Sequence, residues 1–269
     1  MGITYGAGSA TIDAPGDYTI DRDLTQSNPN LHCITINPGV HYVTIRLRSR
    51  LVGAGGVGST NTGIRANGNA AVTLIGDGGS IRGFAYAVSF YNTYLTRIDG
   101  LFVQDALFRG IKLEGDDAII TNCDIREIHG AMFTPSAYCM GIEMSGMTAG
   151  GGKAKVLHNL VQNVHGTNSG GNTGESVGIS ITDLNVNSIV ADNVIQNDTK
   201  PGLPPGGGTS IGIWCGGASS IAVKGNLIRT WDWGLLASSP PSVGKGQNLF
   251  VNCTTDFQIG GPVIPTSED

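Results

Sequence analysis

The sequence predicts an all-β chain: a single-stranded parallel β-helix of roughly 8–10 coils, with three short strands in each coil. The first observation is a recurring Gly-Ile pair, and the second is the alternating segment that follows each pair. The third is the interval between pairs, about 22–24 residues where it is shortest and longer where residues are inserted. One coil cannot bury its own apolar face, so stacked coils must share one core. The pairs are Gly63-Ile64, Gly110-Ile111, Gly141-Ile142, Gly178-Ile179 and Gly212-Ile213, with Ala87-Val88 and Gly234-Leu235 as variants.

Each unit divides into three short strands. In the unit that begins at Ile111, Ile111 and Leu113 face one side of the first strand while Lys112 and Glu114 face the other, because side chains alternate along a strand. A second strand follows at 118–120 and a third at 124–126. Three short strands per unit, glycine-rich corners and no helical period are typical of a parallel β-helix. Later units repeat the three strands at 142–145, 154–156 and 160–162, at 179–182, 188–190 and 194–196, and at 213–216, 220–223 and 227–229.

The corner between the second and third strands repeats asparagine. Asn159, Asn193 and Asn226 share this aligned position, with Cys123 before them and Cys253 after them. Asparagine tolerates the left-handed backbone of a tight turn, and stacked side-chain amides can hydrogen-bond along the axis. We therefore expect an asparagine ladder along this corner.

These features resemble the right-handed parallel β-helix proteins of the pectin-lyase-like superfamily, over nearly the whole chain from about Ile34 to Ile259. Segment 11–20 also looks like the entry strand and cap of bacterial secreted β-helices. The resemblance implies one domain, with an entry strand and cap over 1–32, the β-helix over 33–259 and a C-terminal tail over 260–269. It does not choose a chemistry, because the superfamily includes polysaccharide lyases, glycosidases, uronan epimerases, phage depolymerases and structural modules.

Two catalytic motifs of the superfamily do not match this sequence. The Asp116-Asp117 pair follows a strand, whereas the acidic pair of the β-helix polygalacturonases leads into one, and we interpret it as a turn. The Asp-Pro-His-Asp motif of alginate epimerases is missing.

Charge and composition argue against several classes of partner. The 269 residues carry a net charge of -5, only 14% are charged and no basic run occurs, so nucleic acid is not expected to bind. No apolar stretch approaches the ~20 residues of a membrane span, and Met1-Gly2-Ile3-Thr4 does not begin a signal peptide. The cysteines show no metal-binding spacing and are expected to be buried apolar residues. They are Cys33, Cys123, Cys139, Cys215 and Cys253.

Stacked coils turn each strand position into a column, and charge gathers on one of them. The first outward column of the first strands reads Arg65, Ser89, Lys112, Glu143, Ser180, Trp214 and Leu236. The second contains Tyr91 and Glu114. Adjacent coils lie about 4.8 Å apart, so Lys112 and Glu143 should be direct neighbours with Glu114 within reach. In a chain with so few charges this face is either a functional groove or a solvated ladder of ion pairs, which would add little stability.

Three insertions fall just before first strands, at 131–139, 167–176 and 199–210, and should rise beside this face as binding loops. The first carries Phe133 and Tyr138, which could stack on a sugar ring. His129 and His165 share one aligned position where third strands meet the insertions. Each is either a general base or a turn histidine bonded to a carbonyl. No further ligand completes a metal site, so we expect neither a metal nor another cofactor.

Three functions remain open. The first is a polysaccharide lyase or epimerase acting on a uronic-acid polymer, in which Arg65 or Lys112 neutralises the carboxylate and Lys112, Tyr91 or a histidine removes the C5 proton. The second is a glycosidase using Glu114 and Glu143. The third is a non-catalytic phage or cell-surface module. A polysaccharide or oligosaccharide is the expected partner, in an extracellular, cell-surface or phage setting, while the oligomeric state stays undecided between monomer and homo-oligomer.

Overall fold

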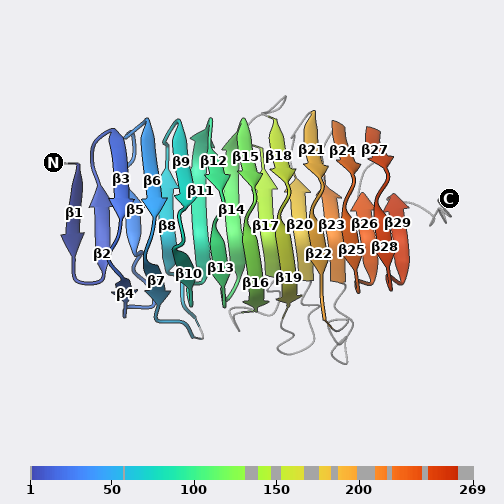
Figure 1. Ribbon diagram of the computed structural model, residues 1–269, viewed down its shortest axis with the longest axis horizontal. Coiled ribbons are helices and arrows are strands. Elements are labelled where there is room, and N and C mark those ends of the chain that lie inside the picture. The colour runs from blue at the N-terminus through green and yellow to red at the C-terminus, as the bar shows by residue number, and fades with distance from the viewer. Residues whose placement is uncertain are drawn as a thin grey trace.

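The chain forms an elongated parallel β-helix in which short strands lie side by side along the long axis (Figure 1). The computed structural model describes residues 2–56, 58–130, 139–146, 153–166, 176–182, 187–198, 210–216, 220–237 and 242–259. Within these residues all regular secondary structure is β-strand, and the strands form three sheets. None of the described residues builds a helix that is long and apolar enough to span a membrane. The predicted fold class, with three strands per coil, is confirmed.

The sheet of first strands has 11 members and carries the predicted Gly-Ile starts. It begins with a hairpin, since β1 runs antiparallel to β2, and every later pair is parallel. The strands are β1 (Ile3–Gly6), β2 (Ser9–Ile12), β5 (Ile34–Ile36), β8 (Thr62–Asn67), β11 (Tyr86–Tyr94), β14 (Arg109–Asp116), β17 (Cys139–Ser145), β20 (Ser176–Thr182), β23 (Ser210–Gly216), β26 (Trp233–Ala237) and β29 (Thr255–Ile259).

The sheets of second and third strands have nine members each. The second-strand sheet contains β3 (Gly16–Ile20), β6 (Val43–Leu47), β9 (Val72–Gly76), β12 (Arg97–Asp99), β15 (Ala118–Thr121), β18 (Ala154–Leu157), β21 (Ser188–Ala191), β24 (Ser220–Lys224) and β27 (Ser242–Gly246). The third-strand sheet contains β4 (Leu24–Gln26), β7 (Arg50–Gly53), β10 (Ser80–Arg82), β13 (Phe102–Gln104), β16 (Asp124–His129), β19 (Leu160–His165), β22 (Val194–Gln196), β25 (Leu227–Arg229) and β28 (Leu249–Val251).

The inward side chains of all three sheets meet in one continuous core. The residues that follow the glycine starts are fully buried there, among them Ile111, Ile142 and Ile179. The glycines themselves are needed for close approach: a Cβ placed on Gly141 would lie 2.7 Å from the carbonyl oxygen of Gly178, one coil on. The repeat therefore marks a position inside each first strand where the next coil leaves no room for a Cβ.

The asparagine ladder is confirmed, with one member corrected. The Nδ2 of Asn193 donates to the Oδ1 of Asn226 at 2.9 Å, and Asn226 donates in turn to Asn248 at 2.9 Å. The fourth member is thus Asn248 and not Cys253, because β28 pairs with β25 so that Leu249 lies opposite Leu227. The left-handed residue is also not the asparagine but the one before it, as at Asp192 with φ 56°.

All five cysteines are free, and four are buried as predicted. Burial raises the pKa of the thiols of Cys33, Cys123, Cys139 and Cys215 to about 12. Such thiols are protonated and unreactive at neutral pH.

Candidate functional site

The outward column of the first-strand sheet has the predicted register. Arg65 lies opposite Ser89, Ser89 opposite Lys112, and Lys112 opposite Glu143. The same column continues through Ser180 and Trp214 to Leu236. A run of parallel in-register pairs thus places the charged residues of several coils on one face of the molecule.

Glu143 is held by two cations from the neighbouring strand β14. Its Oε2 accepts a hydrogen bond from Arg109 Nε at 2.5 Å, and its Oε1 lies 3.5 Å from Lys112 Nζ. The side chains of Arg109 and Glu143 are only 7% and 15% exposed. The guanidinium of Arg109 also lies over the ring of Phe108, 3.8 Å from its centroid. Sequence reasoning predicted the contact with Lys112 but missed Arg109.

Arg109 was missed because it stands just before the Gly-Ile pair, outside the strand segment that was aligned. At this position the next three coils carry Met140, Val177 and Ile211, which form a separate apolar cluster with Trp214, Trp233 and Leu236 packed on it. One more step back in the alignment would have shown a single arginine in an otherwise apolar stretch. The preceding coil has Tyr86 there, which was missed for the same reason.

The second outward column is interrupted by a bulge, in which Tyr91 and Asn92 together stand where one residue was expected opposite Glu114. The register of β11 against β14 shifts between Phe90 and Thr93, and Asn92 takes a left-handed φ of 50°. A bulge adds a residue to one strand and re-aims its side chains. Glu114 lies opposite Ser145 and takes no part in the ion pairs of Glu143. Tyr91 instead faces Lys112, whose Nζ lies 5.3 Å from the centre of the tyrosine ring.

A pocket of about 520 Å³ opens on this face at the end of the column that carries Arg65. Arg65, Tyr86, Ser89 and Tyr91 line it, and the described lining residues include no carboxylate. Burial, with smaller contributions from Tyr91 and Glu143, raises the pKa of Tyr86, and Arg109 opposes the shift. Tyr86 is therefore a hydrogen-bond donor at neutral pH. The remaining lining residues are Asn30, His32, Thr60, Thr62, Asn67 and Asn92.

Arg65 is paired with a histidine that sequence reasoning did not single out. Its Nη1 lies 2.5 Å from Nε2 of His32. Burial, followed by the charge of Arg65, lowers the pKa of His32. His32 lies between β4 and β5, outside the repeating strands, and no sequence pattern links it to Arg65.

Several polar atoms on this face have no hydrogen-bond partner among the described residues. Ser89 is 2% exposed and Ser180 is 0% exposed, yet the hydroxyl of neither makes a hydrogen bond to any described residue. The same holds for Nε1 of Trp214 in the same column. Buried polar groups are nearly always satisfied, so unsatisfied ones in a line call for an explanation.

The two predicted histidines belong to a different sheet. His129 and His165 lie opposite each other on β16 and β19, with their rings stacked at 6.0 Å between centroids. Burial and the charge of His129 lower the pKa of His165, while Glu127 and Asp198 oppose this. All three of these charged groups stand on or next to third strands. The structure therefore does not bring the histidines into contact with Lys112 or Tyr91.

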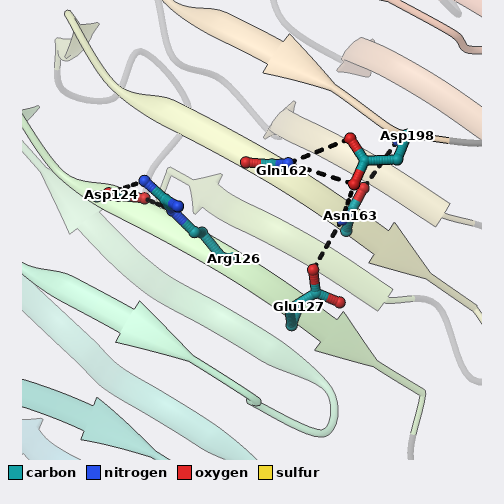
Figure 2. Close-up of polar contacts among 6 residues, drawn as sticks. All are labelled: Asp124, Arg126, Glu127, Gln162, Asn163 and Asp198. Atoms are coloured by element: carbon teal, nitrogen blue, oxygen red, sulfur yellow. Dashed lines mark hydrogen bonds and ion pairs between the residues drawn. The ribbon is translucent and has the colours of Figure 1, made fainter.

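Carboxylates and amides on the same third strands form a polar network (Figure 2), and its Glu127 lies 3.5 Å from Nε2 of His129. Asn163 Nδ2 donates to Glu127 at 2.7 Å and to Asp198 at 2.9 Å, bridging two acidic side chains across successive strands. Asp124 is paired with Arg126 on the same strand. Among the described residues no group of His, Cys, Asp or Glu side chains is arranged to hold a metal ion.

Trp214 stands five coils along the column from Arg65, half-buried against the outer apolar cluster. Phe133 and Tyr138 fall outside the described residues, as do the interiors of the three insertions.

Comparison with solved structures identifies the same architecture in two bacteriophage proteins. The enzymatically active domain of tailspike protein 2 of bacteriophage CBA120 superposes with a TM-score of 0.55 at 13% identity, covering 94% of this chain and 42% of that one. A mutant tailspike protein of E. coli bacteriophage HK620, solved with a pentasaccharide, gives a TM-score of 0.57 at 8% identity over 98% of this chain and 55% of that one.

The fold is a right-handed parallel β-helix. At such low identity the likeness concerns the fold alone, and the β-helix spans about half the length of the tailspike chains it matches. No model of a known protein family matches the sequence. No curated protein matches it either.

Proposed function

We propose that this β-helix binds an acidic glycan on the outer face of its first-strand sheet and acts on it as a lyase or epimerase of uronic-acid residues. The observation that carries the proposal is the pocket beside Arg65, whose described lining residues combine one guanidinium, two tyrosines and several hydroxyl and amide groups and include no carboxylate. Sugar sites combine aromatic surfaces with a few placed polar groups. A guanidinium supplies the planar pair of donors that a carboxylate accepts.

The same groups suit proton abstraction beside a carboxylate. Arg65 would neutralise the uronate and so acidify the C5 proton, and Tyr91, next to the ammonium of Lys112, would remove it. In elimination the C4–O bond then breaks, and protonated Tyr86 would donate to the departing oxygen. In epimerisation a proton would return to C5 on the opposite face.

The geometry of the column favours a chain-like ligand. Arg65, Lys112 and Trp214 are partly exposed and stand in one in-register column, so a polymer lying along the axis would meet each of them in turn. A glycan offers hydroxyl and ring oxygens at every residue. Of the two tailspikes with this fold, one was solved with a pentasaccharide, which favours an oligosaccharide partner and a phage-particle or extracellular setting.

A glycosidase using Glu114 and Glu143 has less support. Both carboxylate oxygens of Glu143 contact cations. Glu114 lies opposite Ser145, two residues further along the strand than the residue opposite Glu143. A general acid must be free to deliver a proton to the leaving oxygen. A non-catalytic glycan-binding module would use the same pocket and remains the second candidate.

The test is incubation with a panel of uronate polymers. A lyase would generate the ultraviolet absorbance of an unsaturated uronate, and an epimerase would exchange the C5 proton with solvent deuterium, visible by NMR. Reducing ends released without that absorbance would indicate a glycosidase instead. Binding of a uronate without any turnover would reject the enzyme functions and support the non-catalytic glycan-binding module.

Arg65→Gln tests whether Arg65 binds the sugar carboxylate. Arg46→Gln, on the exposed face of β6, is its control. Loss of a charged hydrogen bond of about 1.5–3 kcal/mol predicts roughly tenfold to hundredfold weaker uronate binding for Arg65→Gln. Equal binding by the two variants would reject Arg65 as the carboxylate site.

A further inference from the structure

The contact between Arg65 and His32 fixes the protonation state of the histidine. A guanidinium has only donors, so Nε2 of His32, at 2.5 Å from Nη1 of Arg65, must offer its lone pair. The ring proton of the neutral imidazole is therefore on Nδ1. That atom is buried and has no hydrogen-bond partner among the described residues. No carboxylate or carbonyl of the described chain locks the ring in this state.

We propose that His32 is the second cation of the acidic-sugar site: it is neutral in the free protein and takes up one proton when a sugar carboxylate occupies Arg65. The proposal rests on the proposed function, because it assumes an acidic ligand in this pocket. The proton comes from solvent and binds Nε2 as the hydrogen bond from Arg65 breaks. Arg65 and the new Nε2–H group then each donate to one carboxylate oxygen.

Electrostatics gives the direction of the coupling. In the free protein a proton on His32 would face the guanidinium of Arg65, and the two positive charges repel. A carboxylate between them attracts both and favours the charged imidazole. The other titratable groups that line the pocket are Tyr86 and Tyr91 of β11, and a tyrosine side chain never carries a positive charge, so neither repels a charged imidazole. On its own segment the backbone oxygen of His32 accepts from Gln26 at 3.2 Å, which holds the backbone in place.

The coupling makes affinity depend on pH. In the free protein the pKa of His32 lies below its usual 6.5, because of burial and Arg65. Ligand binding raises it. Between the two values the complex binds more protons than the free partners, so affinity grows as pH falls, by at most about tenfold per pH unit. Above the higher value affinity is flat, and near the pKa of the sugar carboxylate, about 3.5, binding is lost.

Isothermal titration calorimetry tests the coupling directly. The probe is the tightest binder among oligogalacturonate, oligomannuronate, oligoguluronate and hyaluronan fragments, titrated at about pH 6 in two buffers with different heats of ionisation. Proton uptake appears as a difference between the two observed enthalpies. An NMR titration of the His32 ring, free and with the same probe, should show its pKa rising on binding.

The variant His32→Gln separates binding from protonation. A glutamine oxygen can still accept from Arg65 but cannot ionise, so binding should persist while the buffer-dependent enthalpy and the pH dependence vanish. His158→Asn is the control, because His158 is exposed and its left-handed backbone, φ 56°, suits asparagine. It should retain the proton uptake of the unmodified protein.

Three results are distinguishable. Uronate binding with identical enthalpies in both buffers would overturn the role of His32 and leave the proposed function standing. Unchanged proton uptake in His32→Gln would also overturn it. Binding of neutral glycans alone would overturn the proposed function, and the role of His32 with it.

Discussion

At the scale of single residues, Glu143 has one contact that the aligned repeat predicts and one that it does not. The repeat places Lys112 opposite Glu143, and the structure has them opposite, with a 3.5 Å contact. The shorter contact is to Arg109, which stands on the same strand, one residue before the glycine of the repeat. Because Arg109 and Glu143 are largely buried, their pairing is a different kind of interaction from the solvated ladder that the sequence also allowed.

This difference predicts the effect of removing the carboxylate. Glu143→Ala removes the carboxylate that faces the nearly buried guanidinium of Arg109, which should lower the free energy of unfolding by about 3 kcal/mol. Lys112→Ala removes a longer and more exposed contact and should cost less than about 1 kcal/mol. Urea unfolding measures both free energies, provided that the dependence of the unfolding free energy on urea concentration is the same for the variants and the unmodified protein. If Glu143→Ala were as stable as the unmodified protein and yet inactive, Glu143 would act on substrate directly and its structural role would be refuted.

At the scale of elements, the asparagine ladder is the most regular polar feature of the described chain. Each amide reaches both along the axis and back to a strand carbonyl: Asn193 Nδ2 lies 2.9 Å from the carbonyl oxygen of Val156, and its Oδ1 accepts from the backbone of Asn159 at 2.9 Å. The sequence predicted the ladder because three of its members recur in one position. The sequence misplaced the last member, Cys253 instead of Asn248, because the position of the final coil follows from the pairing of β28 with β25. Comparing sequence motifs does not reveal that pairing.

Replacing a central rung tests how much the ladder contributes. Asn193→Ala strands the buried backbone N–H of Asn159 and the carbonyl oxygen of Val156, at about 1–3 kcal/mol for each unsatisfied group. We expect the free energy of unfolding to fall by roughly 3 kcal/mol or more. Asn248→Ala, at the half-exposed end of the ladder, is the matched variant and should cost less, because water can replace the lost amide. Equal losses in denaturant melts would contradict a burial-dependent ladder.

At the scale of the whole molecule, the period of the sequence determines the rod but not the pocket. Stacking needs only the Gly-Ile repeat and its apolar alternation, and both are visible in the sequence. The pocket also needs residues between the repeating strands, such as His32 and Thr60, which no period covers. The bulge at Asn92, which turns Tyr91 toward Lys112, is invisible for a related reason: it shifts the register within one coil and leaves the interval between coils nearly unchanged.

The rod also sets the length of ligand that the face can hold. Arg65 and Trp214 are five coil steps apart in one column, about 24 Å at the usual strand spacing. If Arg65 holds an acidic residue at one end, a longer glycan lying along the axis reaches the indole of Trp214 at the other. Affinity for uronate oligosaccharides should therefore rise with chain length until the glycan spans this distance.

Trp214→Met tests the span. Methionine keeps an apolar contact with the cluster around Val177 but removes the flat ring and the Nε1 donor, so long oligosaccharides should bind roughly tenfold more weakly, as for a loss of about 1.4 kcal/mol. The shortest oligosaccharides should bind unchanged, because they reach only the end near Arg65. Tyr42→Asn, which removes a 74% exposed aromatic side chain next to the second-strand sheet, serves as the control. If Trp214→Met weakened the binding of short and long ligands equally, the tryptophan would act by supporting the structure of the Arg65 pocket. The idea that the glycan lies along the axis would then be rejected.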